Sequence, residues 1–273
     1  MPRTSVPISG GRADVAYDRT GSGPGLVLVH GTGADRNQWR PLTAAVADRY
    51  TVVAPDYSGS GETTDPGGPL TLADLAAEVL AAADHAGLDT FHLVGHSLGA
   101  AVAAHLAADH PARVRSLALH AGWVATDARM ATDLRHWREL LRADARHGTT
   151  LFAEMLTLTA FGPRYWARTT VEANAQLVRA LAPVVAPGTD RQVHVDLAVD
   201  LTDRLAAITA PTLVLASAYD RIVGPEQQQA LVAGIAGARY AEIDAGHGAP
   251  AEDPVGFVAR LATFLDEQRL LTA

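Results

Sequence analysis

The chain has 273 residues, of which 48% are hydrophobic and 19% are charged, a balance typical of a folded globular protein rather than a disordered one. Its formal net charge of −8 disfavours binding to nucleic acid or to an anionic membrane surface, because both interactions need a cationic face. The chain has no cysteine, which excludes disulfides and a cysteine nucleophile, and no lysine, which excludes Schiff-base chemistry and a lysine-containing phosphate loop.

The N-terminal segment, residues 1–17, has no apolar stretch of the length found in secretory signal peptides. No segment reaches the run of about 18 uninterrupted apolar residues that suggests a transmembrane helix. A reducing compartment also fits the lack of cysteine. We therefore expect a cytoplasmic protein that does not enter a membrane.

Short apolar runs alternate with helical patterns over the first 120 residues, which is the signature of βαβ units and a largely parallel sheet. Two polar-ended segments, 4–9 and 12–18, predict a hairpin. Further strands are expected at residues 26–30, 50–54, 91–95 and 114–120, and helices at residues 37–47, 72–87 and 97–109. The pattern therefore predicts an α/β protein.

The pattern changes between residues 124 and about 205, where helical stretches follow one another without a convincing strand. Helices are expected there at residues 127–147, 150–160 and 169–182. Alternation then resumes with strands at 212–216 and 238–243 and helices at 226–235 and 253–268. The simplest account is one α/β core, formed by residues 1–123 and 206–273, with a helical cap inserted at residues 124–205, after the sixth strand.

A G-x-S-x-G sequence, Gly95-His96-Ser97-Leu98-Gly99, lies between an apolar strand and an Ala-rich helix. At such a turn the serine is held in a strained conformation with its hydroxyl exposed. The flanking glycines let the strand and helix backbones pass closely. The helix N-terminus supplies N–H groups and positive potential for a developing oxyanion. The position of the motif predicts that Ser97 is a nucleophile.

Together with three other landmarks, this motif resembles the α/β-hydrolase superfamily over nearly the whole chain. His30-Gly31-Thr32-Gly33 is similar to the family's oxyanion turn, and residues 56–61 are similar to its DxxGxG loop. Asp220 and Gly246-His247 match its acid and histidine turns, in the family order of serine, acid and histidine. The resemblance implies an α/β-hydrolase fold, with a mostly parallel eight-stranded sheet flanked by helices and a helical cap after the sixth strand.

The resemblance also implies a Ser-His-Asp triad. Ser97 is expected to attack a carbonyl group, while His247 takes the serine proton and returns it to the leaving group. Asp220 is expected to orient the imidazole of His247 and to stabilise its cation. Two other carboxyl groups remain open as the acid: Asp127, which follows the preceding strand, and Asp244, which lies three residues before His247.

Two further groups of residues are expected at the site. The family uses the main-chain N–H groups that follow the His-Gly pair and the nucleophile, so Thr32 and Leu98 are expected to form the oxyanion hole. Substrate contacts are expected from the cap, above Ser97. The candidates are large apolar side chains that packing within the cap explains equally well, namely Trp123, Met130, Trp137, Phe152, Met155, Phe161, Tyr165 and Trp166.

The sequence therefore predicts a hydrolase that acts on a small apolar ester, lactone or thioester through an acyl-enzyme. No metal-ligand pattern and no complete dinucleotide motif is present, so neither a metal nor another cofactor is expected. The expected partner is a small-molecule substrate, not nucleic acid or membrane. C–C bond hydrolysis, acyl transfer, perhydrolysis and cyclisation by the same triad remain open, as does a non-catalytic ligand receptor on the same fold.

Overall fold

The computed structural model describes residues 1–183, 185 and 187–271, and an eight-stranded sheet lies at its centre. The strands of the described chain are β1 (Arg3–Ile8), β2 (Gly11–Thr20), β3 (Gly25–Val29), β4 (Thr51–Pro55), β5 (Phe91–His96), β6 (Val114–His120), β7 (Thr212–Ser217) and β8 (Arg239–Ile243). They lie side by side in the order β1-β2-β4-β3-β5-β6-β7-β8. The pairs β1–β2 and β2–β4 are antiparallel and the others are parallel. The predicted hairpin and mostly parallel sheet are confirmed.

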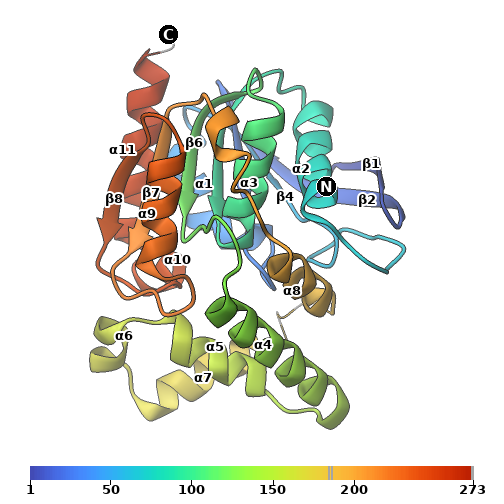
Figure 1. Cartoon of the computed structure of the whole chain (residues 1–273), viewed down its shortest axis with the longest axis vertical. Helices are drawn as coiled ribbons and strands as arrows, with labels where there is room; N and C mark the ends of the chain where they lie inside the picture. The colour runs from blue at the N-terminus through green and yellow to red at the C-terminus, as the bar shows by residue number, and fades with distance from the viewer. Residues whose placement is uncertain (184, 186, 272–273) are drawn as a thin grey trace.

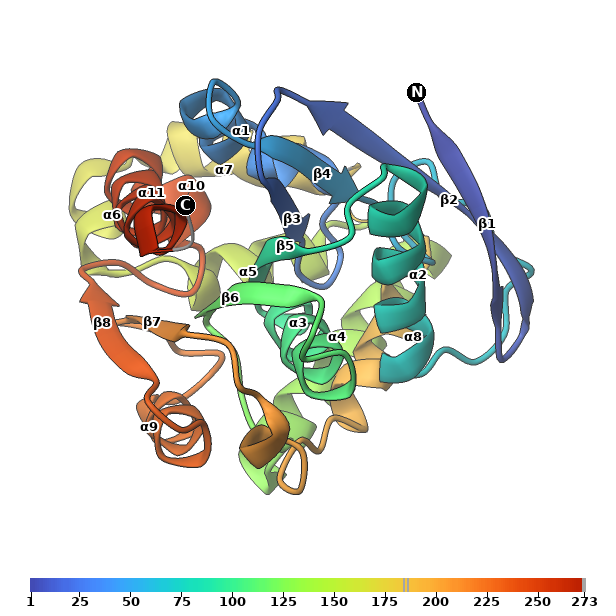
Figure 2. The same cartoon turned by 90° about the horizontal axis from the view of Figure 1, so that it is seen from above.

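Helices cover both faces of this sheet (Figure 2). One face is covered by α1 (Arg40–Val46) and α11 (Pro254–Leu271), and the other by α2 (Leu72–His85), α3 (Leu98–Asp109) and α9 (Pro225–Gly234). Side chains alternate along the buried strands, so Leu26 and Leu28 pack toward α1 and α11 while Val27 and Val29 pack toward α2 and α3. The sheet therefore has a hydrophobic core on each side.

Helix α2 starts where the sequence predicts it, at a capping box. The Thr71 hydroxyl accepts the main-chain N–H of Asp74, and the Asp74 carboxylate accepts the N–H of Thr71 at 2.9 Å. Helix α3 is buried on every side from Leu98 to Ala108, which explains why small alanines dominate it. Its N-terminus is thereby fixed against the ends of the central strands, where the candidate site lies.

Five α-helices lie between β6 and β7 within the described chain: α4 (Ala128–His147), α5 (Leu151–Ala160), α6 (Pro163–Arg168), α7 (Val171–Leu181) and α8 (Thr189–Leu197). They form a layer of their own beyond one end of the sheet (Figure 1). An antiparallel bridge between Ala125 and Asp200 joins the chain entering this layer to the chain leaving it. We call residues 124–205 the insertion. A helical insertion after the sixth strand is thus confirmed.

Two details differ from the expected elements. The single helix expected at residues 37–47 is divided into a 3-10 helix, η1 (Arg36–Trp39), and α1, because Pro41 lacks an N–H group and favours the first turn of a new helix. Helix α6, which also begins with a proline, and helix α8 were not predicted. The remaining short helices are η2 (Leu205–Ala207) and α10 (Ala249–Glu252). Among the described residues, no helix has both the length and the apolar character needed to cross a membrane.

Candidate active site

Ser97 occupies a sharp turn between β5 and α3. Its φ of 55° and ψ of −123° lie in a region that residues other than glycine rarely adopt, and its main-chain N–H donates to the carbonyl of His120 at 2.9 Å. A Cβ on Gly95 would lie 2.2 Å from the carbonyl oxygen of Gly99, and a Cβ on Gly99 would lie 2.2 Å from that of Val29. The two glycines are therefore required by the close passage of the strands and helix around Ser97.

Ser97, His247 and Asp220 form a continuous line of hydrogen bonds. The distance between Ser97 Oγ and His247 Nε2 is 3.0 Å, and that between His247 Nδ1 and Asp220 Oδ2 is 2.9 Å. The residues follow β5, β8 and β7, whose carboxyl ends meet at one edge of the sheet. Ser97 is 8% exposed and His247 is 6% exposed, so the line is largely shielded from water. With its proton on Nδ1, the imidazole of His247 donates to Asp220 and accepts from Ser97.

The second carboxylate oxygen of Asp220 fixes the loop that carries it. Oδ1 accepts the main-chain N–H groups of Ile222 at 2.9 Å and Val223 at 2.8 Å. Helix α9 begins later, with Gly224 as its N-cap, so Asp220 does not cap that helix. These contacts orient the carboxylate and leave Oδ2 for His247.

The two other carboxyl groups considered for the acid have different partners. Asp127 is the N-cap of α4 and accepts the main-chain N–H of Met130 at 2.8 Å. Asp244 forms an ion pair with Arg164 of α6 at 2.7 Å. The hydrogen bonds of the site therefore favour Asp220 over both alternatives.

The turn that contains Thr32 lies directly beside Ser97. A Cβ on Gly31 would lie 3.0 Å from the His96 ring and 3.2 Å from Ser97 Cβ. Leu98 opens α3, where main-chain N–H groups have no acceptor within the helix. Within the described chain, the N–H groups of Thr32 and Leu98 donate to no protein acceptor. Both amides thus have no protein acceptor within the described chain, as expected of donors reserved for a bound molecule.

Helix α8 of the insertion contacts this turn through two polar side chains, Gln192 and Asp196, that the motifs do not predict. The Thr32 hydroxyl donates to Asp196 Oδ2 at 2.8 Å, and the Gly33 N–H donates to Gln192 Oε1 at 2.9 Å. Burial raises the pKa of Asp196 to about 7, although the bond from Thr32 opposes this shift. The sequence signal that could have revealed Asp196 is a carboxylate within an apolar stretch, between Val195 and Leu197.

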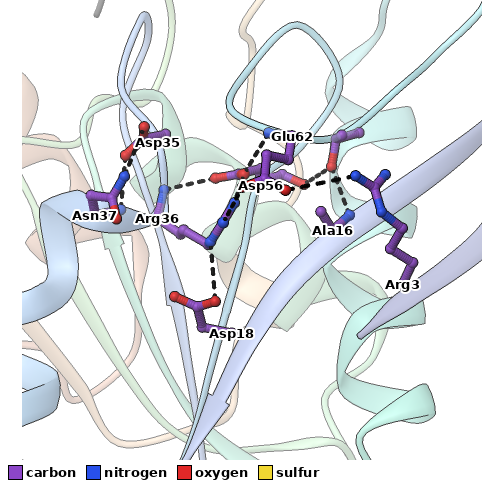
Figure 3. Close-up of polar contacts among 9 residues, drawn as sticks. Arg3, Ala16, Asp18, Asp35, Arg36, Asn37, Asp56 and Glu62 are labelled. Atoms are coloured by element: carbon purple, nitrogen blue, oxygen red, sulfur yellow. Dashed lines mark hydrogen bonds and ion pairs between the residues drawn. The ribbon is translucent and has the colours of Figure 1, made fainter. Parts of the chain in front are cut away.

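The DxxGxG loop bonds Arg36, three residues after Gly33 (Figure 3). The buried carboxylate of Asp56 accepts the main-chain N–H of Arg36 at 2.8 Å and forms an ion pair with its guanidinium. Arg36 also pairs with Glu62 at 3.0 Å and with Asp18 at 3.2 Å. This cluster joins β2, the segment after the Thr32 turn and the loop after β4.

Two further histidines lie buried behind His247. His96 and His120 share a hydrogen bond between their Nδ1 atoms at 2.8 Å, and His120 Nε2 bonds Ser217 Oγ at 3.0 Å. The ring centroid of His96 lies 5.1 Å from that of His247. Burial lowers the pKa of His120 to about 3 and that of His96 well below its ordinary value. Both imidazoles are therefore neutral, and neither places a positive charge beside His247.

The apolar side chains considered as substrate contacts lie mainly inside the insertion. Trp137 and Phe152 pack edge to face with ring centroids 5.6 Å apart, and Trp123 donates its indole N–H to the hydroxyl of Thr126 at 2.9 Å. Phe152 borders a cavity of about 410 Å³ whose described lining belongs entirely to the insertion. Met130 is buried in a hydrophobic cluster, and Met155, Tyr165 and Trp166 are partly buried against that cluster.

Phe161 is the member of this group that lies next to the histidine turn. Its ring is 3.5 Å from the position that a Cβ on Gly248 would occupy. The carbonyl of Ala160 accepts the N–H of Gly248 at 2.8 Å. The corner between α5 and α6 therefore contacts the turn that carries His247.

No group of three or more His, Asp or Glu residues in the described ranges is arranged to hold a metal ion.

Comparison with known proteins gives one family. A family model described as "alpha/beta hydrolase fold" matches residues 24–254. Pyrrolizixenacetamide deacetylase from Xenorhabdus hominickii is 39% identical over 258 residues, covering 93% of this chain and 96% of the relative. A thermophilic esterase from Thermogutta terrifontis superposes with a TM-score of 0.85 and 26% identity, covering 98% of this chain and 99% of that one. The enol-lactonase from Burkholderia xenovorans LB400 gives a TM-score of 0.80 and 25% identity, with 96% and 100% covered.

Proposed function

Since the chain belongs to the α/β-hydrolase family, we propose that it is a serine hydrolase in which Ser97 attacks the carbonyl carbon of a small molecule and forms an acyl-enzyme. The observation that carries the proposal is the line of hydrogen bonds from Ser97 Oγ through His247 to Asp220, at 3.0 and 2.9 Å. A serine hydroxyl is a weak nucleophile until a base takes its proton, and His247 is within reach of that proton.

Acylation follows from the positions of these groups. His247 Nε2 takes the Ser97 proton as Oγ bonds to the carbonyl carbon, and the carbonyl oxygen becomes an oxyanion. The main-chain N–H groups of Thr32 and Leu98 receive that charge, and each such donor typically lowers the barrier by about 2.7–4 kcal/mol. The imidazolium then gives its proton to the leaving group as the bond to the carbonyl carbon breaks.

Deacylation repeats these steps with water. His247 takes a proton from a water molecule that attacks the acyl carbon, and the second oxyanion forms in the same place. Its collapse breaks the bond to Ser97 Oγ, which regains a proton from His247, and the free acid leaves. Asp220 holds the imidazole in the required tautomer in both halves and stabilises its cation. The neutral state of His96 and His120 supports this role, because no neighbouring imidazolium opposes that cation.

The favoured substrates are small apolar esters, lactones and thioesters. Ser97 and His247 are 8% and 6% exposed, which favours a small molecule that can enter the protein over a large substrate held at its surface. The solved relatives named as an esterase and an enol-lactonase support the same bond types. An N-acetyl amide is a second candidate, favoured by the 39% identity to a protein named as a deacetylase.

We further propose that residues 1–123 and 206–273 form the catalytic core and that residues 124–205 act as a cap that selects the substrate. Two contacts between the cap and the core support these two roles. Helix α8 bonds the turn that carries Thr32, and the corner between α5 and α6 bonds the turn that carries His247. A cap attached at both turns can discriminate between substrates by their fit between the cap and these turns.

A substrate panel tests the proposal. Short p-nitrophenyl esters, a lactone, an acyl thioester and an N-acetyl amide are offered to the wild-type protein, and release of the free acid is measured. We expect turnover of at least one class and its loss in Ser97→Ala. Ser116→Ala is the matched control, because Ser116 is a buried serine whose hydroxyl bonds His92 at 2.8 Å, outside the triad.

The outcomes separate the alternatives. Acid release that depends on Ser97 supports hydrolysis. Products in which the acyl group is transferred or cyclised, or cleavage of only a C–C bond, would assign the same triad to one of those reactions. Binding of panel compounds without turnover would favour a ligand receptor. Turnover that persists in Ser97→Ala would refute Ser97 as the nucleophile.

A further inference from the structure

Asp196 is a buried carboxyl group beside the oxyanion turn that the mechanism above does not use. It is 1% exposed, and its Oδ2 accepts the hydroxyl of Thr32 at 2.8 Å. Within the described chain, its other oxygen, Oδ1, has no hydrogen-bond partner. A buried carboxyl group with one bonded oxygen costs free energy, so its presence at this position calls for a functional reason.

The location of Asp196 in α8 makes this cost greater. Asp196 is the penultimate residue of the helix. It therefore lies at the C-terminal end, which is the negative end of the helix dipole and disfavours a charged carboxylate. Its pKa is raised to about 7 by burial. Strongly perturbed carboxyl groups of this kind cluster at functional sites. The contact with Thr32 is the one polar interaction of the Asp196 carboxyl group within the described chain.

The face of α8 that carries Asp196 is built against the oxyanion turn. Thr189, Gln192 and Asp196 lie three and four residues apart and therefore share one side of the helix. Gln192 binds Gly33 with its carbonyl oxygen, and its amide nitrogen donates to Ser60 Oγ at 2.7 Å. A Cβ on Gly33 would lie 3.2 Å from the Thr189 methyl group. Three residues along this side of α8 therefore contact residues 32 and 33 of the turn.

We propose that Asp196 is a positioning residue for the oxyanion hole: by accepting the hydroxyl hydrogen of Thr32, it fixes the direction of the Thr32 N–H toward the oxyanion. The inference rests on the proposed function, because the direction of that N–H matters only if an oxyanion forms at Ser97. Asp196 belongs to the insertion and Thr32 to the segment after β3. The position of α8 therefore affects how well the oxyanion hole binds an oxyanion.

Four single variants and one double variant test this role through kcat and KM on the best ester of the panel. Asp196→Ala and Thr32→Val each remove the hydrogen bond, from opposite ends, while the Thr32 N–H remains. We expect each to lower kcat by about 10- to 100-fold with little change in KM, the size of loss that misplacement of a catalytic group causes. Asp196→Asn and Thr32→Ser keep an acceptor and a donor, and we expect kcat within about threefold of wild type. The double variant Asp196→Ala/Thr32→Val should lose no more than either single variant.

A second measurement separates positioning from general stability. Phenylboronic acid bonds Ser97 Oγ through boron, the serine proton moves to His247, and the resulting tetrahedral anion places an oxygen in the oxyanion hole. We expect its Kd to rise about 10-fold in Asp196→Ala and Thr32→Val and to stay unchanged in Asp196→Asn and Thr32→Ser. A variant that is merely less stable would show a lower Tm with unchanged boronate affinity in its folded fraction.

The results that would overturn the inference are distinct from those that refute the proposed function. Unchanged kcat and boronate affinity in Asp196→Ala or in Thr32→Val, or additive losses in the double variant, would remove Asp196 from the oxyanion hole. If Asp196→Ala does not fold, Thr32→Val decides the question alone. Activity that persists in Ser97→Ala would instead defeat the proposed function itself.

Discussion

Glu252 accepts the main-chain N–H of Gly162 at 2.8 Å and so ties the insertion to the core. The same oxygen, Oε2, accepts the N–H of Gly246 at 2.8 Å, one residue before His247. The carbonyl of Ala160 adds a bond to Gly248 on the other side of the histidine. The insertion therefore fixes the turn that carries the proposed base, just as α8 fixes the turn that carries the proposed oxyanion hole.

Replacing Glu252 should loosen the histidine turn. In Glu252→Ala both amides lose their shared acceptor, and we expect a Tm several degrees lower and a kcat about 10-fold lower, since a bond to a charged group contributes about 1.5–3 kcal/mol. Glu252→Gln keeps an acceptor oxygen and should retain most activity. Steady-state kinetics and thermal unfolding measure both effects. Glu242→Ala, an exposed glutamate of β8, is the control; equal losses in Glu242→Ala and Glu252→Ala would contradict the prediction.

The identity of the acid is tested by exchanging carboxylates for amides. Asp220→Asn should lower kcat by about 10³- to 10⁴-fold, because the variant no longer holds the required tautomer of His247. Asp127→Asn should leave kcat nearly unchanged, since Asp127 caps α4. A larger loss of kcat in Asp127→Asn than in Asp220→Asn would reverse the assignment.

Ser97 and His247 should behave as one unit. Alone, Ser97→Ala and His247→Ala are each expected to remove nearly all catalysed turnover, and the double variant should be little worse than either. The check is kcat/KM for all three variants on one ester, with circular dichroism to establish that each is folded. Losses that simply multiply would show that the two residues act independently.

The buried carboxyl group of Asp196 gives a prediction for stability against pH. Its pKa is about 7 in the folded chain, above the ordinary value of 3.8, so the unfolded chain loses this proton first as pH rises. The stability that the neutral form contributes is therefore present at low pH and lost as pH rises through 7. Asp196→Asn lacks this titration. Glu78, whose pKa burial also raises to about 7, is present in both proteins and cancels from the comparison.

Urea unfolding at pH 5 and pH 8 measures this difference. The free energy of unfolding of Asp196→Asn, relative to wild type, should rise by on the order of 2 kcal/mol between the two pH values. The free energies of unfolding of the two proteins are subtracted at each pH, so titrations that both proteins share cancel from the difference. Parallel pH dependences of the two proteins would show that Asp196 has no raised pKa in the folded state.

The sheet and the core of the site could be predicted from sequence because their signals are local. Ser97 is marked by glycines two residues away on each side, and the strands by short apolar runs between turns. Helix α6 was missed because it has only six residues and starts at a proline. Asp196 and Glu252 were missed for a different reason: their partners, Thr32 and Gly162, are 164 and 90 residues away along the chain.

The central claim is that Ser97 is the activated nucleophile, and covalent labelling tests it most directly. The protein is treated with a fluorophosphonate probe, its intact mass is measured, and the labelled peptide is sequenced by mass spectrometry. The account predicts one phosphonyl group per chain, carried by Ser97, with no label in Ser97→Ala, much slower labelling in His247→Ala and normal labelling in Ser116→Ala. A label on any other residue, or equal labelling of Ser97→Ala and wild type, would contradict it.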